Sequence, residues 1–173
     1  MQSVLKWNNK AWPWAAYGPA IMTAVRAGVP VMGANLPRES MRAAMRNAAL
    51  DARLSGPALK AQQQLIRLGH CNLLPENQIG LMTRIQSAKD ISMANTLSKA
   101  ALPGVAVVLL TGSGHADQLL GMLRHLLAIW SAKPSGCALA MLRRLTAPRC
   151  LTRCGLRLLC LTRITARNLK RRR

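Results

Sequence analysis

The sequence predicts an α/β fold with a partial parallel sheet, crossover helices and missing N-terminal strands. Two short apolar runs, residues 29–37 and 105–110, are each bounded by Gly or Pro, which is typical of buried parallel strands. The stretch between them has apolar residues near helical period, so strand, helices and strand follow one another as in a βαβ unit. Because two strands do not make a stable sheet, we expect the others to precede Met1, to come from another chain or to be lost.

Each element has its own local signals. A helix is predicted over 19–27, because Pro19 suits a first turn and Gly28 suits a C-terminal stop. The run 29–37 then forms the first strand and ends in Asn35-Leu36-Pro37-Arg38, a strand-to-loop exit.

The helical layer follows in two or three segments. Ser40 is a candidate cap for a helix through Ala48, and Pro57 opens a second helix that ends near Gly69-His70. A third is predicted over 76–100, with apolar residues at helical spacing: Ile79, Met82, Ile85, Ala88, Met93 and Leu97. After Pro103-Gly104, the β-branched run 105–110 forms the second strand and leads into Gly112-Ser113-Gly114-His115.

Composition divides the chain at residue 116. Of 173 residues 50% are hydrophobic, which is ample for one core, and the net charge is +20. Residues 1–116 hold 12 Lys and Arg against 4 acids, a net +8, whereas residues 117–173 hold 13 against 1, a net +12. We therefore expect an α/β domain over 1–116 and a basic tail over 117–173, rich in Leu, Arg and Cys and irregular or helical. Such bias is typical of translation in a shifted reading frame.

Signals for export are missing from the written sequence. No apolar run or small-residue cleavage site follows Met1, so the expected location of the chain as written is the cytoplasm. The longest apolar run, 100–110, is too short for a transmembrane helix. Five cysteines, an odd number, argue against a disulfide framework in a chain without a secretion signal.

Three sets of residues could carry chemistry. Ligands of open α/β sheets bind beyond the carboxyl ends of the strands, where His115 lies; the alternative is a solvated residue in a tight turn. His70 and Cys71 follow a predicted helix stop and form a weak metal-binding motif. The alternative is that His70 closes the helix and Cys71 is a buried core residue. Gln86, Asp90 and Met93 share one helical face, which either lines a site or marks the edge of the core.

The order of several short blocks resembles ChaN-like haem-binding lipoproteins. The blocks are Trp12-Pro13-Trp14 with Tyr17-Gly18-Pro19, Gly28 to Val31, Ala34 to Arg38, Gly69-His70-Cys71 with Leu74-Pro75, Gln86 with Asp90, Met93 and Ala94, and Val107 to Leu110 with Gly112, Gly114 and His115. The resemblance covers about residues 7–116. It stops at Ala116, and nothing before Trp7 matches the acidic and His-containing start of this family.

The resemblance implies haem binding at the edge of a parallel sheet, in a bacterial outer-membrane or periplasmic lipoprotein of iron uptake that forms a homodimer. It makes Tyr17, His70 and His115 candidate ligands of the haem iron. Arg38 becomes a candidate partner of the haem propionates. The wider superfamily looks similar to erythromycin-esterase-like hydrolases.

Two other functions compete with haem binding. The basic residues of the tail could bind nucleic acid or an anionic surface, but no aromatic platform accompanies them: Arg143, Arg144, Arg149, Arg153, Arg157 and Lys170 to Arg173. A metal-assisted hydrolase would use His70, Glu76, Asp90 and His115. It ranks below haem binding because only four acids precede the tail. We therefore expect haem as the partner, and neither nucleic-acid binding nor enzymatic activity.

Overall fold

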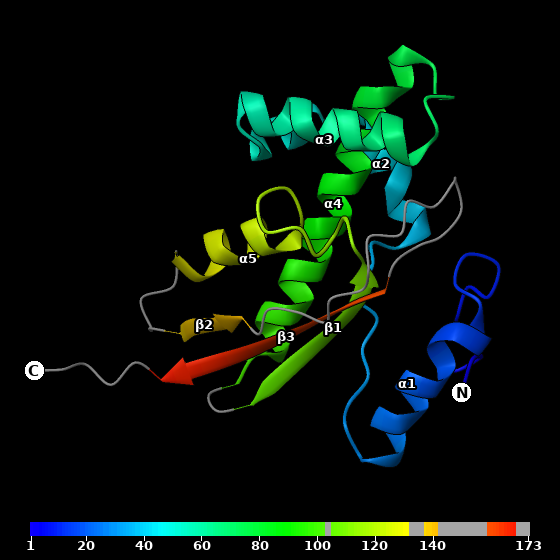
Figure 1. Cartoon of the computed structure of the whole chain (residues 1–173), viewed down its shortest axis with the longest axis vertical. Helices are drawn as coiled ribbons and strands as arrows, with labels where there is room; N and C mark the ends of the chain where they lie inside the picture. The colour runs from blue at the N-terminus through cyan, green and yellow to red at the C-terminus, as the bar shows by residue number, and fades with distance from the viewer. Residues whose placement is uncertain (103–104, 132–136, 142–158, 169–173) are drawn as a thin grey trace, which may run out of the picture. The chain divides into compact units, whose positions relative to one another are not determined.

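The computed structural model describes residues 1–102, 105–131, 137–141 and 159–168. The chain forms two compact units, Met1–Ala34 and Asn35–Arg173. The elements follow in the order α1 (Trp14–Arg26), η1 (Arg38–Ser40), α2 (Met41–Arg46), η2 (Ala48–Arg53), α3 (Gly56–Gly69), α4 (Glu76–Ala100), β1 (Ala106–Gly112), α5 (Met122–Ser131), β2 (Cys137–Met141) and β3 (Leu159–Asn168) (Figure 1).

An aromatic cluster holds the first unit together. The ring centroids of Trp7 and Trp14 lie 5.3 Å apart, and those of Trp12 and Tyr17 lie 5.0 Å apart, both in edge-to-face arrangements. The indole Nε1 of Trp7 donates a hydrogen bond to the backbone oxygen of Trp12 at 2.6 Å. Gly18 permits this packing, because a Cβ there would lie 2.5 Å from the ring of Trp14.

This cluster moves the start of the first helix. Helix α1 begins at Trp14 rather than at Pro19, so Pro19 lies inside the helix. Asn9 Oδ1 accepts a hydrogen bond from the backbone N–H of Trp14 at 2.7 Å, which satisfies one donor of the first turn. The predicted end is confirmed, since Gly28 has φ +69°, a left-handed conformation that suits glycine after a helix.

The predicted first strand over 29–37 is wrong. These residues form neither a helix nor a strand, and the boundary between the two units falls at Ala34. Val29 and Met32 are 54% and 55% exposed, so the run is not buried. Pro30 and Pro37 have no backbone N–H to donate to a sheet. Without a strand over 29–37, the predicted βαβ crossover is not formed by these residues.

The helical layer is confirmed. Helices α2, α3 and α4 occupy the predicted segments, and α4 runs over all of residues 76–100. Arg84 of α4 binds the segment before α3, because its Nε and Nη2 donate to the two carboxylate oxygens of Asp51 in η2 at 3.0 and 2.7 Å. Its Nη1 also donates to the backbone oxygen of Met45 at 3.1 Å, which ties α2 and η2 to α4.

The second predicted strand is confirmed as β1, but its pairing is antiparallel. The described strands form one sheet in the order β1-β3-β2 (Figure 1). Strand β3 pairs antiparallel with β1 from Ala106 opposite Thr165 to Gly112 opposite Leu159, and β2 pairs antiparallel with β3. The predicted parallel sheet is therefore not formed in the described residues. Strands β2 and β3 lie in the tail. The prediction that the tail is irregular or helical is therefore wrong for residues 137–141 and 159–168.

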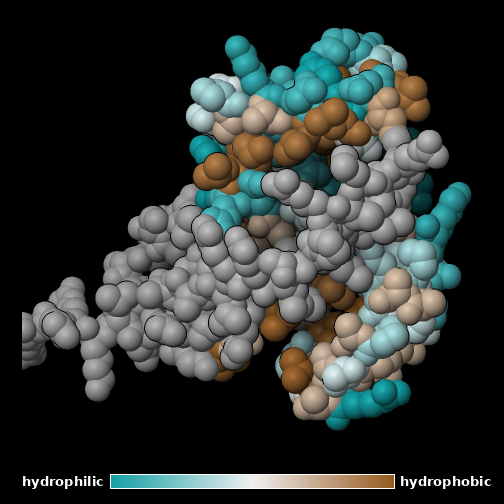
Figure 2. All heavy atoms as spheres, viewed as in Figure 1, coloured by the Kyte–Doolittle hydropathy of each residue, from teal (hydrophilic) through white to brown (hydrophobic). Residues whose placement is uncertain are grey.

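Helix α5 adds the remaining part of the described core. It packs against α4, and the side chains of Met122, Leu123 and Leu126 are 0%, 2% and 0% exposed. This helix starts six residues after the predicted domain boundary at 116. It agrees with the prediction of helical structure for this part of the tail. Polar and apolar side chains both reach the surface of the described part (Figure 2). No helix among the described residues combines the length and apolarity that a membrane span requires.

A buried histidine in α5 predicts an acid-sensitive fold. His125 is 7% exposed, and its Nε2 has no hydrogen-bond partner in the part of the chain that the structure describes. Burial lowers the pKa of His125 from 6.5, and the nearby Arg124 and Arg53 lower it further. The unfolded chain therefore binds this proton more readily than the folded chain. The contribution to stability is complete above pH 6.5 and is lost as the pH falls from 6.5 toward the folded pKa.

We expect the urea midpoint of unfolding to fall on acidification from about pH 7.5 to 5.5, a range that spans the ordinary histidine pKa. His125→Met removes the buried imidazole and should flatten much of this fall. His70→Gln serves as the control and should retain it. An equal acid loss in His125→Met and in the unchanged chain would contradict the prediction.

Candidate functional site

The candidate site lies where β1 ends. Strand β1 finishes at Gly112, and the backbone N–H groups of His115 and Ala116 donate to the oxygens of Gly112 and Ser113, both at 3.1 Å. The chain therefore folds into two successive turns that place His115 just beyond the strand. This confirms the strand-to-loop transition predicted at this sheet edge.

The imidazole of His115 is held by two residues of α4. Its Nδ1 lies 2.7 Å from Oδ1 of Asp90 and 3.0 Å from Nε2 of Gln86. The His115 side chain is 15% exposed and that of Asp90 is 1% exposed. Within the described part of the chain, no hydrogen bond engages the other ring nitrogen, Nε2. The alternative of a solvated loop residue is therefore wrong for His115.

Asp90 is an unusual residue for a buried helix face. Burial raises the pKa of its carboxyl group, and the hydrogen bond from His115 opposes that rise. Its second oxygen, Oδ2, is buried and has no hydrogen-bond partner among the described residues. Met93, one turn further along α4, accepts a hydrogen bond at its sulfur from Oγ1 of Thr111 at 3.6 Å. The face shared by Gln86, Asp90 and Met93 therefore lines the candidate site, although its sequence pattern fitted a core boundary equally well.

A compact loop after His115 holds the histidine in place. The backbone oxygen of His115 accepts a hydrogen bond from the N–H of Met122 at 2.9 Å. Asp117 Oδ1 accepts hydrogen bonds from the N–H groups of Leu119 and Leu120 at 2.8 and 2.9 Å. Gly121 is buried, and a Cβ there would lie 2.5 Å from the oxygen of His115. This contact could not be read from the sequence.

The other predicted site residues are spread over the chain. Tyr17 belongs to the first unit, where it is 6% exposed and packs in the aromatic cluster. His70 closes α3, and its Nδ1 lies 2.8 Å from the oxygen of Ile66. Cys71 beside it is disulfide-bonded, so its sulfur is not free for a metal. Arg38 begins η1 and is exposed.

The residues of the hydrolase alternative do not come together. Glu76 forms an ion pair with Arg67 at the start of α4. Asp90 lies fourteen residues further on, about 21 Å along the helix axis at 1.5 Å per residue. Among the described residues, no group of three or more His, Cys, Asp or Glu could hold a metal ion. The geometry therefore gives no support to a metal site made of His70, Glu76, Asp90 and His115.

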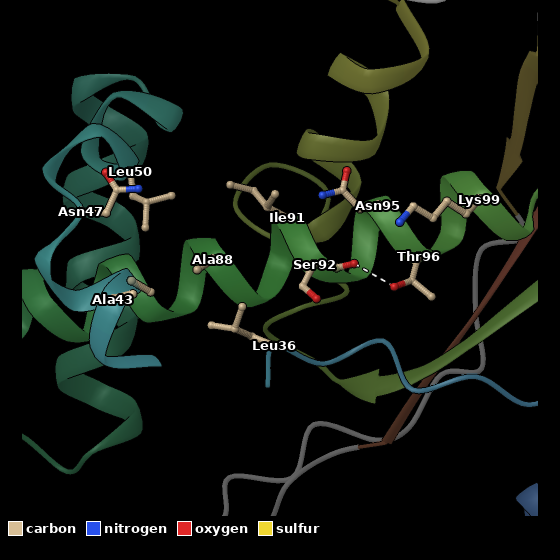
Figure 3. A pocket seen from close by; sticks show the side chains of 11 residues that line it. Leu36, Ala43, Asn47, Leu50, Ala88, Ile91, Ser92, Asn95, Thr96 and Lys99 are labelled. Carbon is tan, nitrogen blue, oxygen red and sulfur yellow. Dashed lines mark hydrogen bonds between the residues drawn. The ribbon is translucent and has the colours of Figure 1, made fainter. Parts of the chain in front are cut away.

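A groove of about 480 Å³ lies on the other side of α4 (Figure 3). Lining residues from the second unit are Leu36, Ala43, Ala44, Asn47, Leu50, Ala88, Ile91, Ser92, Asn95, Thr96 and Lys99. Ser92 is two positions from Asp90 and so about 200° around the helix. These described lining residues include no His, Tyr, Cys or Met, so they supply no ligand for haem iron. Neither His115 nor Asp90 is among them.

Comparison with known proteins identifies the family. The model of the family described as haem-binding uptake, Tiki superfamily, ChaN matches residues 1–126, which is more than half of the chain. The match includes every candidate ligand and extends past Ala116 into α5. No curated protein and no solved structure matches the chain. The chain belongs to the ChaN family of haem-binding uptake proteins in the Tiki superfamily.

Proposed function

We propose that this chain binds haem and that Nε2 of His115 would hold the haem iron. The family supports the class of ligand. The observation that carries the assignment to His115 is the geometry of its ring, with Nδ1 held against Asp90 at 2.7 Å and Nε2 left without a protein partner in the described residues.

The donor set around His115 fits haem better than a bare metal ion. Haem iron already has four nitrogen ligands from the macrocycle and needs only one or two from the protein, so a single histidine is sufficient. When bound, haem would supply the redox-active iron, while the chain supplies the ligand and the surroundings. The side chain of His115 is 15% exposed, so part of it reaches the surface. Arg38 stays our candidate for the propionates, because it is an exposed cation.

His70 and Tyr17 are the competing ligands. The Nδ1 of His70 is also engaged, but by a backbone oxygen of the helix that it closes, and this hydrogen bond has a structural role in ending α3. Tyr17 is almost fully buried among tryptophans. Tyr17 is therefore less accessible to haem than His115. His70 already caps a helix through its ring nitrogen. A homodimer stays a prediction.

Haem titration of the full chain tests this proposal. We expect a saturable Soret band, and His115→Ala should weaken haem binding by about tenfold or more, since loss of about 1.4 kcal/mol of ligation is a factor of ten. His70→Ala and Tyr17→Phe are the matched controls and should bind nearly as well as the unchanged chain. Wild-type affinity and an unchanged Soret position in His115→Ala would show that His115 is not the ligand. Absence of saturable binding by the unchanged chain would overturn haem binding itself.

A further inference from the structure

The groove on α4 is largely apolar at one end and polar at the other. Toward the start of α4 its lining includes Leu36, Leu50 and Ala88, and toward the end of α4 it includes Thr96 and Lys99 (Figure 3). Its volume of about 480 Å³ lies in the range of sites that hold small organic molecules. The groove therefore suits a ligand with an apolar body and a polar head.

Hydrogen bonds within the protein account for two of the polar lining residues. At the apolar end, Oδ1 of Asn47 accepts a hydrogen bond from the backbone N–H of Ala49 at 3.1 Å and so caps η2. At the other end, the hydroxyl group of Thr96 donates to the backbone oxygen of Ser92 at 3.0 Å, within α4. Local structure therefore explains why Asn47 and Thr96 are polar.

Lys99 and Asn95 have no such explanation. Among the residues that the structure describes, no hydrogen bond or ion pair engages either side chain, and both residues are exposed. The amino group of Lys99 points back along α4 toward Asn95 and Thr96 (Figure 3). The described lining contains no Asp or Glu. An anion at this end of the groove would therefore meet a full positive charge and an amide donor.

The extent of the lining along α4 sets the length of the ligand. Ala88 and Lys99 are eleven residues apart, which is about 16 Å along the helix axis at 1.5 Å per residue. A saturated carbon chain with bonds of about 1.5 Å and tetrahedral angles advances about 1.25 Å per carbon, so about twelve carbons span this distance.

We infer that the groove binds a straight-chain fatty carboxylate of about twelve carbons, with its alkyl chain against Leu50 and Ala88 and its carboxylate beside Lys99. Charge complementarity selects the head group, and the apolar lining selects the chain. This site is additional to the proposed haem site, because neither His115 nor Asp90 lines the groove.

Titration calorimetry of the full chain with alkyl carboxylates of increasing length, below their micelle-forming concentrations, tests the fit. Each methylene that the groove buries should tighten binding by up to about fourfold. We expect the affinity to rise from octanoate to dodecanoate and to level off at hexadecanoate, where the chain is longer than the groove. An affinity that does not rise, or that continues to rise through hexadecanoate, would overturn the inference.

Lys99→Met tests the head group. It should weaken dodecanoate binding by about fivefold, the effect of one exposed ion pair at the strong end of its range, and Lys99→Arg should not. Lys60→Met is the matched control, because Lys60 is exposed on α3 and its loss lowers the net charge equally. Equal losses in Lys99→Met and Lys60→Met would overturn the inference, since they would reflect only the charge of the whole chain.

Ala43→Trp tests the apolar end, where Ala43 is an exposed lining residue. The indole should occupy the groove and weaken dodecanoate binding by about tenfold or more, a loss of about 1.4 kcal/mol. Ala61→Trp, at an exposed position of α3 outside the groove, should not. Equal affinities in these two variants would overturn the inference.

Haem separates this inference from the proposed function. His115→Ala should bind dodecanoate as the unchanged chain does, and haem should not displace dodecanoate. Displacement by haem would overturn a separate site, whereas saturable dodecanoate binding by a chain that fails to bind haem would contradict only the proposed function.

Discussion

Replacing Gly121 with alanine is expected to displace the loop that carries His115 and to weaken haem binding without changing any candidate ligand. A Cβ at this position would lie 2.5 Å from the backbone oxygen of His115 and 2.8 Å from those of Asp117 and Gly114. Real Cβ atoms do not approach backbone oxygens so closely, so the loop must move. Overpacking of this kind destabilises a fold by about 1–3 kcal/mol. We expect haem affinity to fall by about tenfold or more, which corresponds to about 1.4 kcal/mol.

Gly114→Ala is a close control for this prediction. It makes the same substitution in the same loop, but a Cβ there would meet nothing within 4 Å. Urea unfolding followed by circular dichroism measures the stability of both variants, and the Soret titration measures their haem binding. If Gly121→Ala and Gly114→Ala had equal effects on both, close packing of the loop would not be what positions His115.

Truncation of Leu126 to alanine should be the most destabilising of the substitutions that avoid the candidate site. This side chain is 0% exposed in α5, which packs on α4. Removing a buried leucine side chain loses its transfer free energy and leaves a cavity, which together lower the free energy of unfolding by about 2–5 kcal/mol. For a chain of this length, each kcal/mol lowers the melting temperature by about 2–4 °C.

Leu119→Ala is the control, because Leu119 is 73% exposed and its truncation should change stability by about 0.5 kcal/mol or less. Thermal unfolding of the three full-length chains would compare them directly. A loss in Leu126→Ala no larger than that in Leu119→Ala would mean that the contact between α4 and α5 contributes little to stability.

Local signals predicted most of the helices. The period of Ile79, Ile85 and Leu97 marked α4 over its full length, because an apolar stripe at helical spacing is a property of one segment and needs no partner to define it. Pro57 and Gly69 marked the start and the end of α3, which are also signals within one segment. The start of α1 could not be predicted, since it depends on contacts between Trp7 and Trp14 that the sequence does not specify.

The strands show where local signals fail. Residues 29–37 and 105–110 have similar apolar character, but only the second becomes a strand, because a strand exists only where another lies beside it to complete its hydrogen bonds. Strand β1 finds that partner in β3, from a part of the chain whose composition predicted none. Neither apolar run indicates which strand pairs with β1 or that the pairing is antiparallel.

The sequence by itself determined the helical layer, the strand that ends in Gly112-Ser113-Gly114-His115, and the family, through short blocks in a given order. The tertiary structure decided what His115 touches. Asp90 lies twenty-five residues before His115. The spacing of Asp90 with Gln86 and Met93 fits the edge of a core as well as it fits a binding site. Only the packing of α4 beside the end of β1 brings its carboxylate to Nδ1, because contacts across such a separation depend on how whole elements meet rather than on the pattern within either one.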